Sequence, residues 1–352
     1  MPHIDTLVVG QGLAGSALAW HLLGAGERVL VIDDDHKSAS SMVAAGLINP
    51  LAGMRFNRRP EMDDWLDAAD RWYSKLETRF GQHFHHALPM LRLFRSPQQR
   101  RFHERRLHDP ASGGLLGTAF EAPDCPEPIM ATYGGFIQQR TGYVDMPALL
   151  TRLAGWLRQS GHLLNCALPS AGIRLTAAGV EANGMHARRV VFCDGYRLAA
   201  NPWFDWLPLT PDKGEILDLR LSGWQPGHII NGAHWLVPCA DRAVRFGATH
   251  EHRQIDTATS SGARSELLAG LHAMMPLAAQ HATLLGQRAG VRPATRDRYP
   301  LLGQHPKHPA LWVFNGFGAR GALTIPWYAR RMSEHLCQGA ALPAEADIRR
   351  FA

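Results

Sequence analysis

The stretch TLVVGQGLAGSALAWHLL (residues 6–23) places three glycines within six positions, between two apolar runs near the start of the chain. Gly10, Gly12 and Gly15 match GxGxxG directly after a strand-like run, residues 6–9, and directly before a helix-like run, residues 16–23. Such glycines allow a tight turn, let a pyrophosphate approach the backbone, and let the helix pack on the strand. The unpaired N–H groups of the helix N-terminus would then bind the phosphates. The pattern therefore predicts a dinucleotide-binding turn.

A carboxylate follows this turn at a suitable distance. The second strand-like run, residues 28–32, ends in Asp33, 18 residues after Gly15. A carboxylate at this place accepts hydrogen bonds from a ribose diol. The alternative is a tight strand-to-helix turn without a ligand, with residues 33–35 as a solvated strand end. The turn, the helix and the acidic residue occur together, which favours nucleotide binding.

The composition describes a two-unit globular protein. The chain has 352 residues, and no run approaches the ~18 apolar residues of a membrane span. The N-terminus has no basic segment typical of a signal peptide, so we expect a cytoplasmic protein. Five scattered cysteines without a CxxC pair predict neither disulfides nor structural zinc. The histidine-rich stretches at 83–86 and 250–252 lack a third ligand at defined spacing, so no metal is expected.

Positive charge is concentrated in one stretch of a chain whose formal charge is +6. Residues 92–108 contain six arginines and a single acidic residue, Glu104. Charge runs usually face solvent, so the favoured interpretation is the exposed face of a helix. The alternative is a surface that contacts RNA.

The order of the expected elements predicts an α/β protein with a discontinuous Rossmann-like domain. Helical patterns at 61–80 and 147–159 and an apolar strand at 190–193 surround segments rich in turns. Short alternating runs between 213 and 249 predict an antiparallel or mixed sheet. We assign residues 1–80, 140–200 and 286–352 to the nucleotide-binding domain, and residues 81–139 and 201–285 to an α+β substrate-binding insert.

A second glycine turn lies near the C-terminus. Gly316, Gly318 and Gly321 separate the apolar run at 312–314 from a helix that begins near Ala322. A ligand can therefore approach a second helix N-terminus. Two such turns fit a long dinucleotide better than a mononucleotide. The alternative is that the glycines only allow tight packing.

An arginine just upstream is suited to carboxylate binding. Arg292 precedes Pro293, which fixes the local backbone, and a guanidinium binds a carboxylate through two parallel hydrogen bonds. The alternative is a structural salt bridge, for instance with Asp297. Weaker candidates for lining a pocket are Tyr299, His250 and Lys213.

These motifs together resemble the flavin-dependent amine oxidoreductases of the D-amino-acid oxidase type, which include glycine oxidase, sarcosine oxidase and D-amino-acid dehydrogenase. VVGQGLAGSALAWHL is similar to the family's adenine-nucleotide motif, and ASSMVAAGLINP to its second flavin-contacting segment. GYVDMPALLTRLA is similar to its connecting helix. GVRPATRDRYPLLG and NGFGARGALTIP are similar to its C-terminal flavin and substrate motif.

The resemblance implies a cofactor, FAD, and roles for individual residues. Arg292 would bind the substrate carboxylate, and Arg320 and Tyr299 complete the expected catalytic set. A cysteine soon after the RP motif marks members with covalent flavin, and residues 294–303 contain none, so dissociable FAD is expected. The expected FAD contacts are Gly10, Gly12, Leu13, Ala14, Gly15, Asp33, Asp34, Ser40, Ser41, Ala45, Gly46, Gly195, Gly316, Gly318, Ala319, Arg320, Gly321 and Ala322.

The implied reaction is oxidation of a carbon–nitrogen bond. In this family a hydride passes from the carbon next to the amine to flavin N5, and water hydrolyses the resulting imine. Glycine oxidase has an arginine two residues before the last glycine of its C-terminal turn, where this chain has Ala319 with Arg320 as neighbour. The first hypothesis is a small amino acid or N-substituted glycine as substrate, with oxygen or a quinone as electron acceptor.

Three other hypotheses remain open from the sequence. GFGARGAL and ATRDRYP resemble the flavin domain of the bifunctional bacterial enzyme that matures a carboxymethylaminomethyl group on the wobble uridine of tRNA. This branch makes tRNA an alternative substrate. A nicotinamide-dependent dehydrogenase would share only the first glycine turn, and a non-catalytic flavin sensor would bind flavin without oxidising an amine. The oligomeric state is left open.

Overall fold

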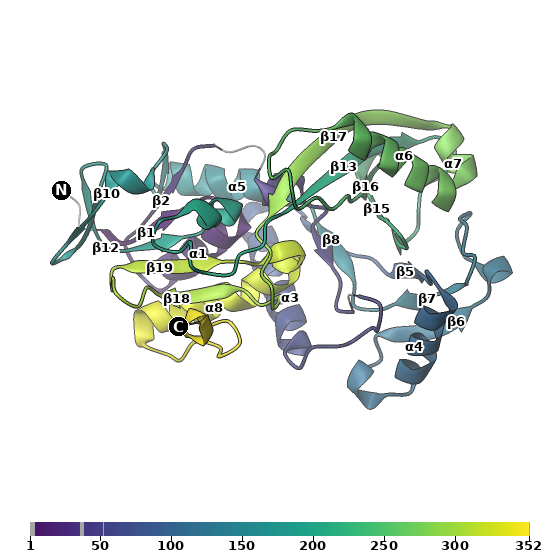
Figure 1. The fold of residues 1–352 in the computed structure, drawn as a ribbon, viewed down its shortest axis with the longest axis horizontal. Helices are drawn as coiled ribbons and strands as arrows, with labels where there is room; N and C mark the ends of the chain where they lie inside the picture. The colour runs from purple at the N-terminus through teal and green to yellow at the C-terminus, as the bar shows by residue number, and fades with distance from the viewer. Residues whose placement is uncertain (1–3, 36–38, 52, 352) are drawn as a thin grey trace.

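The computed structural model describes residues 4–35, 39–51 and 53–351 and contains two large sheets side by side. Figure 1 shows the sheet built around β1 on the left and the sheet built around β13 on the right. Both ends of the chain lie on the side of the β1 sheet, the N-terminus at the far left and the C-terminus below β18. The predicted α/β class is confirmed.

The first sheet has a parallel centre. β1 pairs in parallel with β2 and β12, β12 pairs in parallel with β19, and β2 with β9. The sheet order is β10-β11-β12-β1-β2-β9, and β19 and β18 extend it from β12. Its strands are β1 (Ile4–Val9), β2 (Val29–Asp33), β9 (Leu163–Asn165), β10 (Ile173–Thr176), β11 (Gly179–Ala182), β12 (Met185–Phe192), β18 (Leu301–Gln304) and β19 (Leu311–Asn315).

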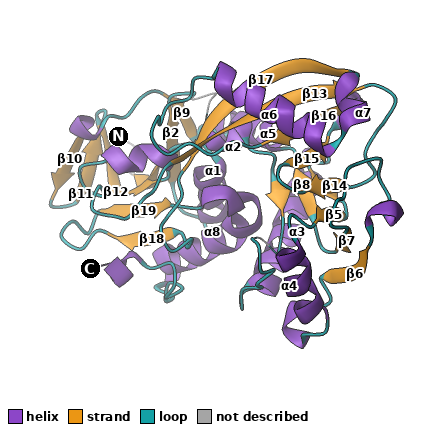
Figure 2. Cartoon of the chain, turned by 45° about the vertical axis from the view of Figure 1, so that its right-hand side comes forward, coloured by secondary structure: helices purple, strands orange, loops and turns teal. Residues whose placement is uncertain are grey.

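Helices bury one face of this sheet. Val8 of β1 belongs to a core that includes Leu18, Tyr73, Leu153 and Tyr328, one from each packed helix. Figure 2 shows these helices in purple, to the right of the strands of this sheet. Leu7, the neighbour of Val8, packs into a second core on the opposite face, because successive side chains of a strand alternate. The four helices are α1 (Leu13–Gly24), α3 (Met62–Phe80), α5 (Met146–Gln159) and α8 (Gly321–Gln338).

The second sheet is mixed, in agreement with the prediction. Its order is β17-β13-β16-β15-β14-β5-β7-β6, and β14 and β5 are its parallel pair. The strands are β5 (Met90–Leu93), β6 (Leu116–Phe120), β7 (Gly135–Gln138), β13 (Asp212–Leu221), β14 (Ile229–Asn231), β15 (Trp235–Pro238), β16 (Ala243–Gly247) and β17 (Ala282–Arg292). The expected domain boundary at residue 286 lies inside β17, so the division into domains stays a prediction.

The remaining elements connect or cover these sheets. A small sheet joins β3, β8 and β4 in that order. The elements are β3 (Leu47–Ile48), β4 (His85–Ala87), β8 (Gly142–Val144), α2 (Ser40–Val43), α4 (Pro97–Leu107), α6 (Ser261–Met274) and α7 (Pro276–Gln280). In the described part of the chain, no helix has the length and apolarity needed to cross a membrane.

The basic stretch at 92–108 divides between two environments. α4 begins after Ser96, whose hydroxyl accepts a hydrogen bond from the Gln99 N–H at 3.2 Å. Arg101 and Arg105 on this helix are exposed, as predicted. The prediction is wrong for Arg92, which lies in β5 with only 5% of its surface exposed. Its Nη1 donates to the carbonyl of Leu51 at 2.6 Å, a partner that the local sequence does not indicate.

Candidate functional site

The carboxyl ends of the parallel strands open into a cavity of about 990 Å³. Val9 ends β1, Asp33 ends β2 and Phe192 ends β12, and all three line the cavity. Ligands of open α/β sheets bind at this edge. We call this cavity the main cavity.

The first glycine turn brings the backbone close to the neighbouring strand. Gly10 has a φ of +102°, and a Cβ at this position would lie 2.6 Å from the carbonyl oxygen of Cys193. Only glycine combines this φ with this approach. α1 begins at Leu13, three residues before the expected start, so Gly15 lies inside the helix.

The N-terminus of α1 faces the main cavity. The N-cap residue is Gly12, which has no side chain to cap this end, and the first turn has no acidic residue. The Leu13 N–H donates to Ser41 Oγ at 3.2 Å, which joins the turn to α2. Gly12, Leu13 and Ala14 line the cavity, so the positive end of the helix dipole is available to an anion.

Two carboxylates lie at the end of β2. Asp33 Oδ2 accepts a hydrogen bond from the Gln11 N–H at 2.7 Å, which ties the strand end to the glycine turn. Asp34 Oδ2 accepts from Arg197 Nη1 at 2.8 Å. Each carboxylate oxygen has two acceptor positions, so Asp33 keeps capacity for ribose hydroxyls.

The C-terminal glycine turn presents a second helix N-terminus to the same cavity. β19 leads through Gly316, with a φ of +80°, into a short 3-10 turn, Gly318–Arg320, and then into α8. No side chain caps α8, and its first turn has no acidic residue. Residues 317–323 line the main cavity.

Arg292 ends β17 and is held by the adjacent strand. Its Nη1 donates to Asp212 Oδ2 at 2.7 Å, and Asp212 is its register partner on β13. Burial alone would raise the pKa of Asp212, but the hydrogen bond with His250 and the charge of Arg292 outweigh burial, and the net pKa lies below its ordinary value. Asp212 therefore stays ionised and orients the guanidinium.

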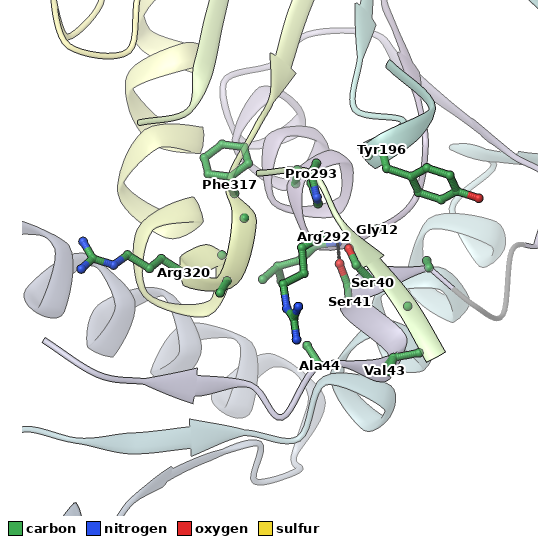
Figure 3. Close-up of a pocket in the computed structure, with 18 of the residues that line it drawn as sticks. Gly12, Ser40, Ser41, Val43, Ala44, Tyr196, Arg292, Pro293, Phe317 and Arg320 are labelled. Atoms are coloured by element: carbon green, nitrogen blue, oxygen red, sulfur yellow. Dashed lines mark hydrogen bonds between the residues drawn. The ribbon is translucent and has the colours of Figure 1, made fainter. Parts of the chain in front are cut away.

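Figure 3 shows the Arg292 side chain next to Ala44 and Pro293, whereas Arg320 extends away from them. The guanidinium of Arg292 lies so close to β13 that a Cβ on Gly214 would be 2.1 Å from Nη2. The expected alternative partner, Asp297, is bonded instead to Arg350 Nε at 2.9 Å. Arg292 is thus both salt-bridged and exposed to the cavity.

Most of the predicted site residues meet in the main cavity. The exceptions are Gly15, Gly316 and Tyr299, which do not line it. Tyr299 instead accepts a hydrogen bond at its hydroxyl from Arg59 Nη1 at 2.5 Å. The predicted residues that line the cavity are Gly10, Gly12, Leu13, Ala14, Asp33, Asp34, Ser40, Ser41, Ala45, Gly46, Gly195, Arg292, Gly318, Ala319, Arg320, Gly321 and Ala322.

Of the weaker candidates, His250 lines the main cavity and Lys213 does not. Lys213 is buried, and its Nζ lies 2.5 Å from Asp256 Oδ1. In the described ranges, no group of three or more acidic, histidine or cysteine side chains is arranged to hold a metal. Of the five cysteines, Cys193 is buried, Cys337 is exposed and the other three are half-buried.

The cavity fits FAD on two observations from this chain. Two helix N-termini whose N-cap residues make no side-chain cap face one space, and the first also has glycine backbone that a phosphate can approach. A diphosphate would fit the end of α1, and the flavin ring would fit the end of α8, where the positive dipole would stabilise negative charge on the ring.

Residues 5–335 match the family of FAD-dependent oxidoreductases named DAO. The chain belongs to the DAO family. The resemblance to D-amino-acid-oxidase-type enzymes, the FAD dependence and the oxidoreductase class are therefore confirmed.

Relatives of this chain include bifunctional proteins. The chain is 28% identical to the tRNA 5-methylaminomethyl-2-thiouridine biosynthesis bifunctional protein MnmC of Aromatoleum aromaticum, over 97% of this chain and 58% of that protein. It therefore spans little more than half the length of that relative. A 25% identical relative is the bifunctional protein ThiO/ThiG of Trichormus variabilis, matched over 96% of this chain and 53% of that protein.

Solved structures of two oxidases share the whole fold. Glycine oxidase from Geobacillus kaustophilus superimposes with a TM-score of 0.85 at 21% identity, covering 100% of this chain and 98% of the enzyme. Iminodiacetate oxidase from Chelativorans sp. BNC1 gives a TM-score of 0.82 at 22% identity, covering 99% and 98%.

Several residues of the site were missed by sequence reasoning. Their positions depend on pairing between distant segments. Asp212 orients Arg292. The main cavity is also lined by Arg92, Asn49 and Trp235. Asp212 directly precedes Lys213, where the alternating runs at 213–249 begin, so its position next to a strand could have drawn attention to it.

Asp194 follows β12 and also lines the main cavity. Its Oδ1 accepts a hydrogen bond from Asn315 Nδ2 at 3.1 Å. Burial raises the pKa of Asp194 from 3.8 to about 7, and its hydrogen bonds and the charge of Arg197 offset only part of this effect. The folded protein therefore favours the neutral carboxyl.

This raised pKa predicts a stability difference that depends on pH. The native pKa lies above the unfolded one, so the stabilising effect of the neutral carboxyl declines as the pH rises from about 4 to 7. From pH 5 to pH 8, the wild type should lose about 2 kcal/mol relative to Asp194→Asn, which does not titrate. Urea unfolding of both proteins with saturating FAD tests this. Parallel pH profiles of the two proteins would contradict it.

Proposed function

We propose that this chain oxidises the carbon–nitrogen bond of a small amino acid or N-substituted glycine. The observation that carries the proposal is the position of Arg292, which faces the same cavity as both helix N-termini. A guanidinium there binds a substrate carboxylate and thereby fixes the distance of the neighbouring amine carbon.

The surroundings of Arg292 support this role. Of the Arg292 nitrogens, Nη1 donates to Asp212, which leaves the donors on Nη2 and Nε for a carboxylate. Gly214 lets the guanidinium lie flat on β13, and Pro293 stiffens the segment that follows. When bound, non-covalent FAD supplies the acceptor for the hydride and its electron pair. Pro293 and Phe317 line the cavity with apolar surface that reduces access of water.

We also propose that the two sheets have different functions. The β1 sheet and its helices hold FAD, and the β13 sheet supplies Arg292 and its supporting Asp212. In this division β17 belongs with the substrate-binding part over its whole length, Ala282–Arg292.

Anaerobic bleaching of the flavin absorbance tests the reaction. The panel contains glycine, sarcosine, iminodiacetate, D-alanine and D-proline, and we expect at least one carboxylate-bearing amine to bleach the flavin. The corresponding amines without a carboxylate serve as controls, because Arg292 cannot bind them. Readmission of oxygen or of a soluble quinone then identifies the electron acceptor. A flavin that no amine bleaches would contradict the proposal.

A substrate attached to tRNA is the second candidate. It is favoured by the MnmC relative, whose match extends over 97% of this chain. The same carboxylate-binding Arg292 would serve a substituted glycine carried by a nucleotide. Salt-sensitive binding of modified tRNA, followed by flavin bleaching with that tRNA, would support this candidate, and the absence of both would exclude it.

A further inference from the structure

A second cavity, of about 540 Å³, adjoins the main cavity. The two share Gly53, Arg298 and Arg320 among their lining residues. The lining of the second cavity has a single acidic residue, Asp109. Its basic residues are Arg55, Arg58, Arg59, Arg106, Arg298 and Arg320, and we call it the arginine cavity.

Two of these arginines have acidic partners. Arg106 Nη1 donates to Asp109 Oδ2 at 2.7 Å, and Arg58 forms an ion pair with Asp63. The Arg58 side chain is 18% exposed, and its buried Nε has no hydrogen-bond partner among the described residues. The ion pair with Asp63 therefore does not satisfy every donor of this guanidinium.

The other four arginines form no ion pair with any acidic residue in the described ranges 4–35, 39–51 and 53–351. Arg59 donates to the Tyr299 hydroxyl and stacks 4.3 Å from the centre of that ring. Arg55 lies 5.6 Å from the centre of the Phe102 ring. These contacts are with neutral groups, so they do not offset the positive charge.

Arg320 shows the electrostatic consequence. Burial lowers the pKa of Arg320, and the nearby charges of Arg59 and Arg298 lower it further. Like charges held together in a partly buried site raise the free energy of the folded state unless an anion is bound. The sequence places these charges on four separate segments, so the fold itself gathers them.

We propose that the arginine cavity binds the phosphate group of a phosphorylated ligand. A phosphate offers several oxygens to planar guanidinium groups at once, whereas a carboxylate offers two. The same chemistry is found in a free phosphate or mononucleotide and in the phosphodiester of a nucleic-acid strand. The link between this ligand and the amine substrate rests on the proposed function, because Arg298 and Arg320 line both cavities.

The test measures binding to the FAD-loaded enzyme without turnover. The probes are inorganic phosphate and AMP, by calorimetry, and a fluorescently labelled single-stranded RNA 12-mer, by anisotropy at two salt concentrations. The test variant is the double substitution Arg55→Gln and Arg59→Gln. The matched control, Arg101→Gln and Arg105→Gln, removes the same charge from the exposed face of α4, outside the cavity.

We expect the cavity variant to lose roughly tenfold or more in affinity, while the α4 variant stays within about threefold of the wild type. Tighter binding of RNA than of AMP would identify a nucleic-acid phosphate, and equal binding would identify a small phosphorylated ligand. Absence of binding by all three probes would overturn the proposal, and so would an equal loss in both variants. Flavin content and the melting temperature confirm that each variant is folded.

These outcomes are separate from those of the amine test. Phosphate binding that depends on Arg55 and Arg59, together with a flavin that no amine bleaches, would reject the proposed function and keep the arginine cavity as a binding site. Bleaching of the flavin by a small amine, without phosphate binding, would keep the proposed function and reject the arginine cavity as a phosphate-binding site.

Discussion

Replacing Arg292 with alanine is expected to lower kcat/KM for a carboxylate-bearing amine by about 30-fold to several thousand-fold, while the protein keeps its FAD. The range corresponds to about 2–5 kcal/mol for loss of a desolvated, charge-assisted pair. FAD content should persist, because the residues at both glycine turns are unchanged. Steady-state kinetics and the flavin absorbance of the purified variant give the two readouts.

A matched control is available on the same strand. Arg288 lies four residues before Arg292 and also forms an arginine–aspartate pair, with Asp218 at 2.8 Å, but it does not line the main cavity. Arg288→Ala should therefore leave KM for the amine nearly unchanged. Arg292→Lys keeps the charge but lacks the planar guanidinium, so its kcat/KM should lie between those of Arg292→Ala and the wild type. An unchanged KM in Arg292→Ala would refute the carboxylate-binding role.

Replacing Gly15 with alanine is expected to destabilise the protein by about 3 kcal/mol or more and to remove most of the bound FAD. Alanine normally stabilises a helix relative to glycine. At this position, however, the added Cβ would lie 1.9 Å from the carbonyl oxygen of Gly10 and 3.2 Å from Val8 Cγ1. α1 must therefore move away from β1, and this movement displaces the N–H groups that face the cavity.

The end of the same helix provides the control. A Cβ on Gly24 would meet no atom within 4 Å. Gly24→Ala should therefore leave the free energy of unfolding unchanged or increase it by up to about 1 kcal/mol, with at most a small rise in the melting temperature. Thermal unfolding and FAD absorbance of both variants decide the point. Equal behaviour of the two variants would show that close packing at Gly15 is not required.

The parts of the fold that could be predicted are those that depend on the residues of one short segment. The first glycine turn, the carboxylate at Asp33 and the helix at 61–80 each follow from spacing within one short segment. α1 begins three residues earlier than predicted. A glycine usually indicates a loop, and the sequence does not show that Gly15 lies inside the helix and packs closely against Gly10.

The parts that could not be predicted depend on pairing between distant segments. Arg292 binds Asp212, which is 80 positions away, rather than the nearby Asp297. Arg92 was assigned to a charged helix because of its arginine neighbours, but β5 carries it into the interior next to Leu51. The arginine cavity has no sequence signature, because its members come from residues 53–59, 106, 298 and 320.

The register between β13 and β17 also fixes the position of Arg292. Arg292 and Asp212 are partners at one end of this ladder, and the ladder has an irregularity between Asp218 and Leu219. Side chains alternate between the two faces of a strand, so a single residue inserted into β17 between 288 and 292 would turn the arginine to the opposite face. Evolution of new substrates in this scaffold is therefore expected to proceed by changes in side chains and loops, with the length of this ladder kept constant.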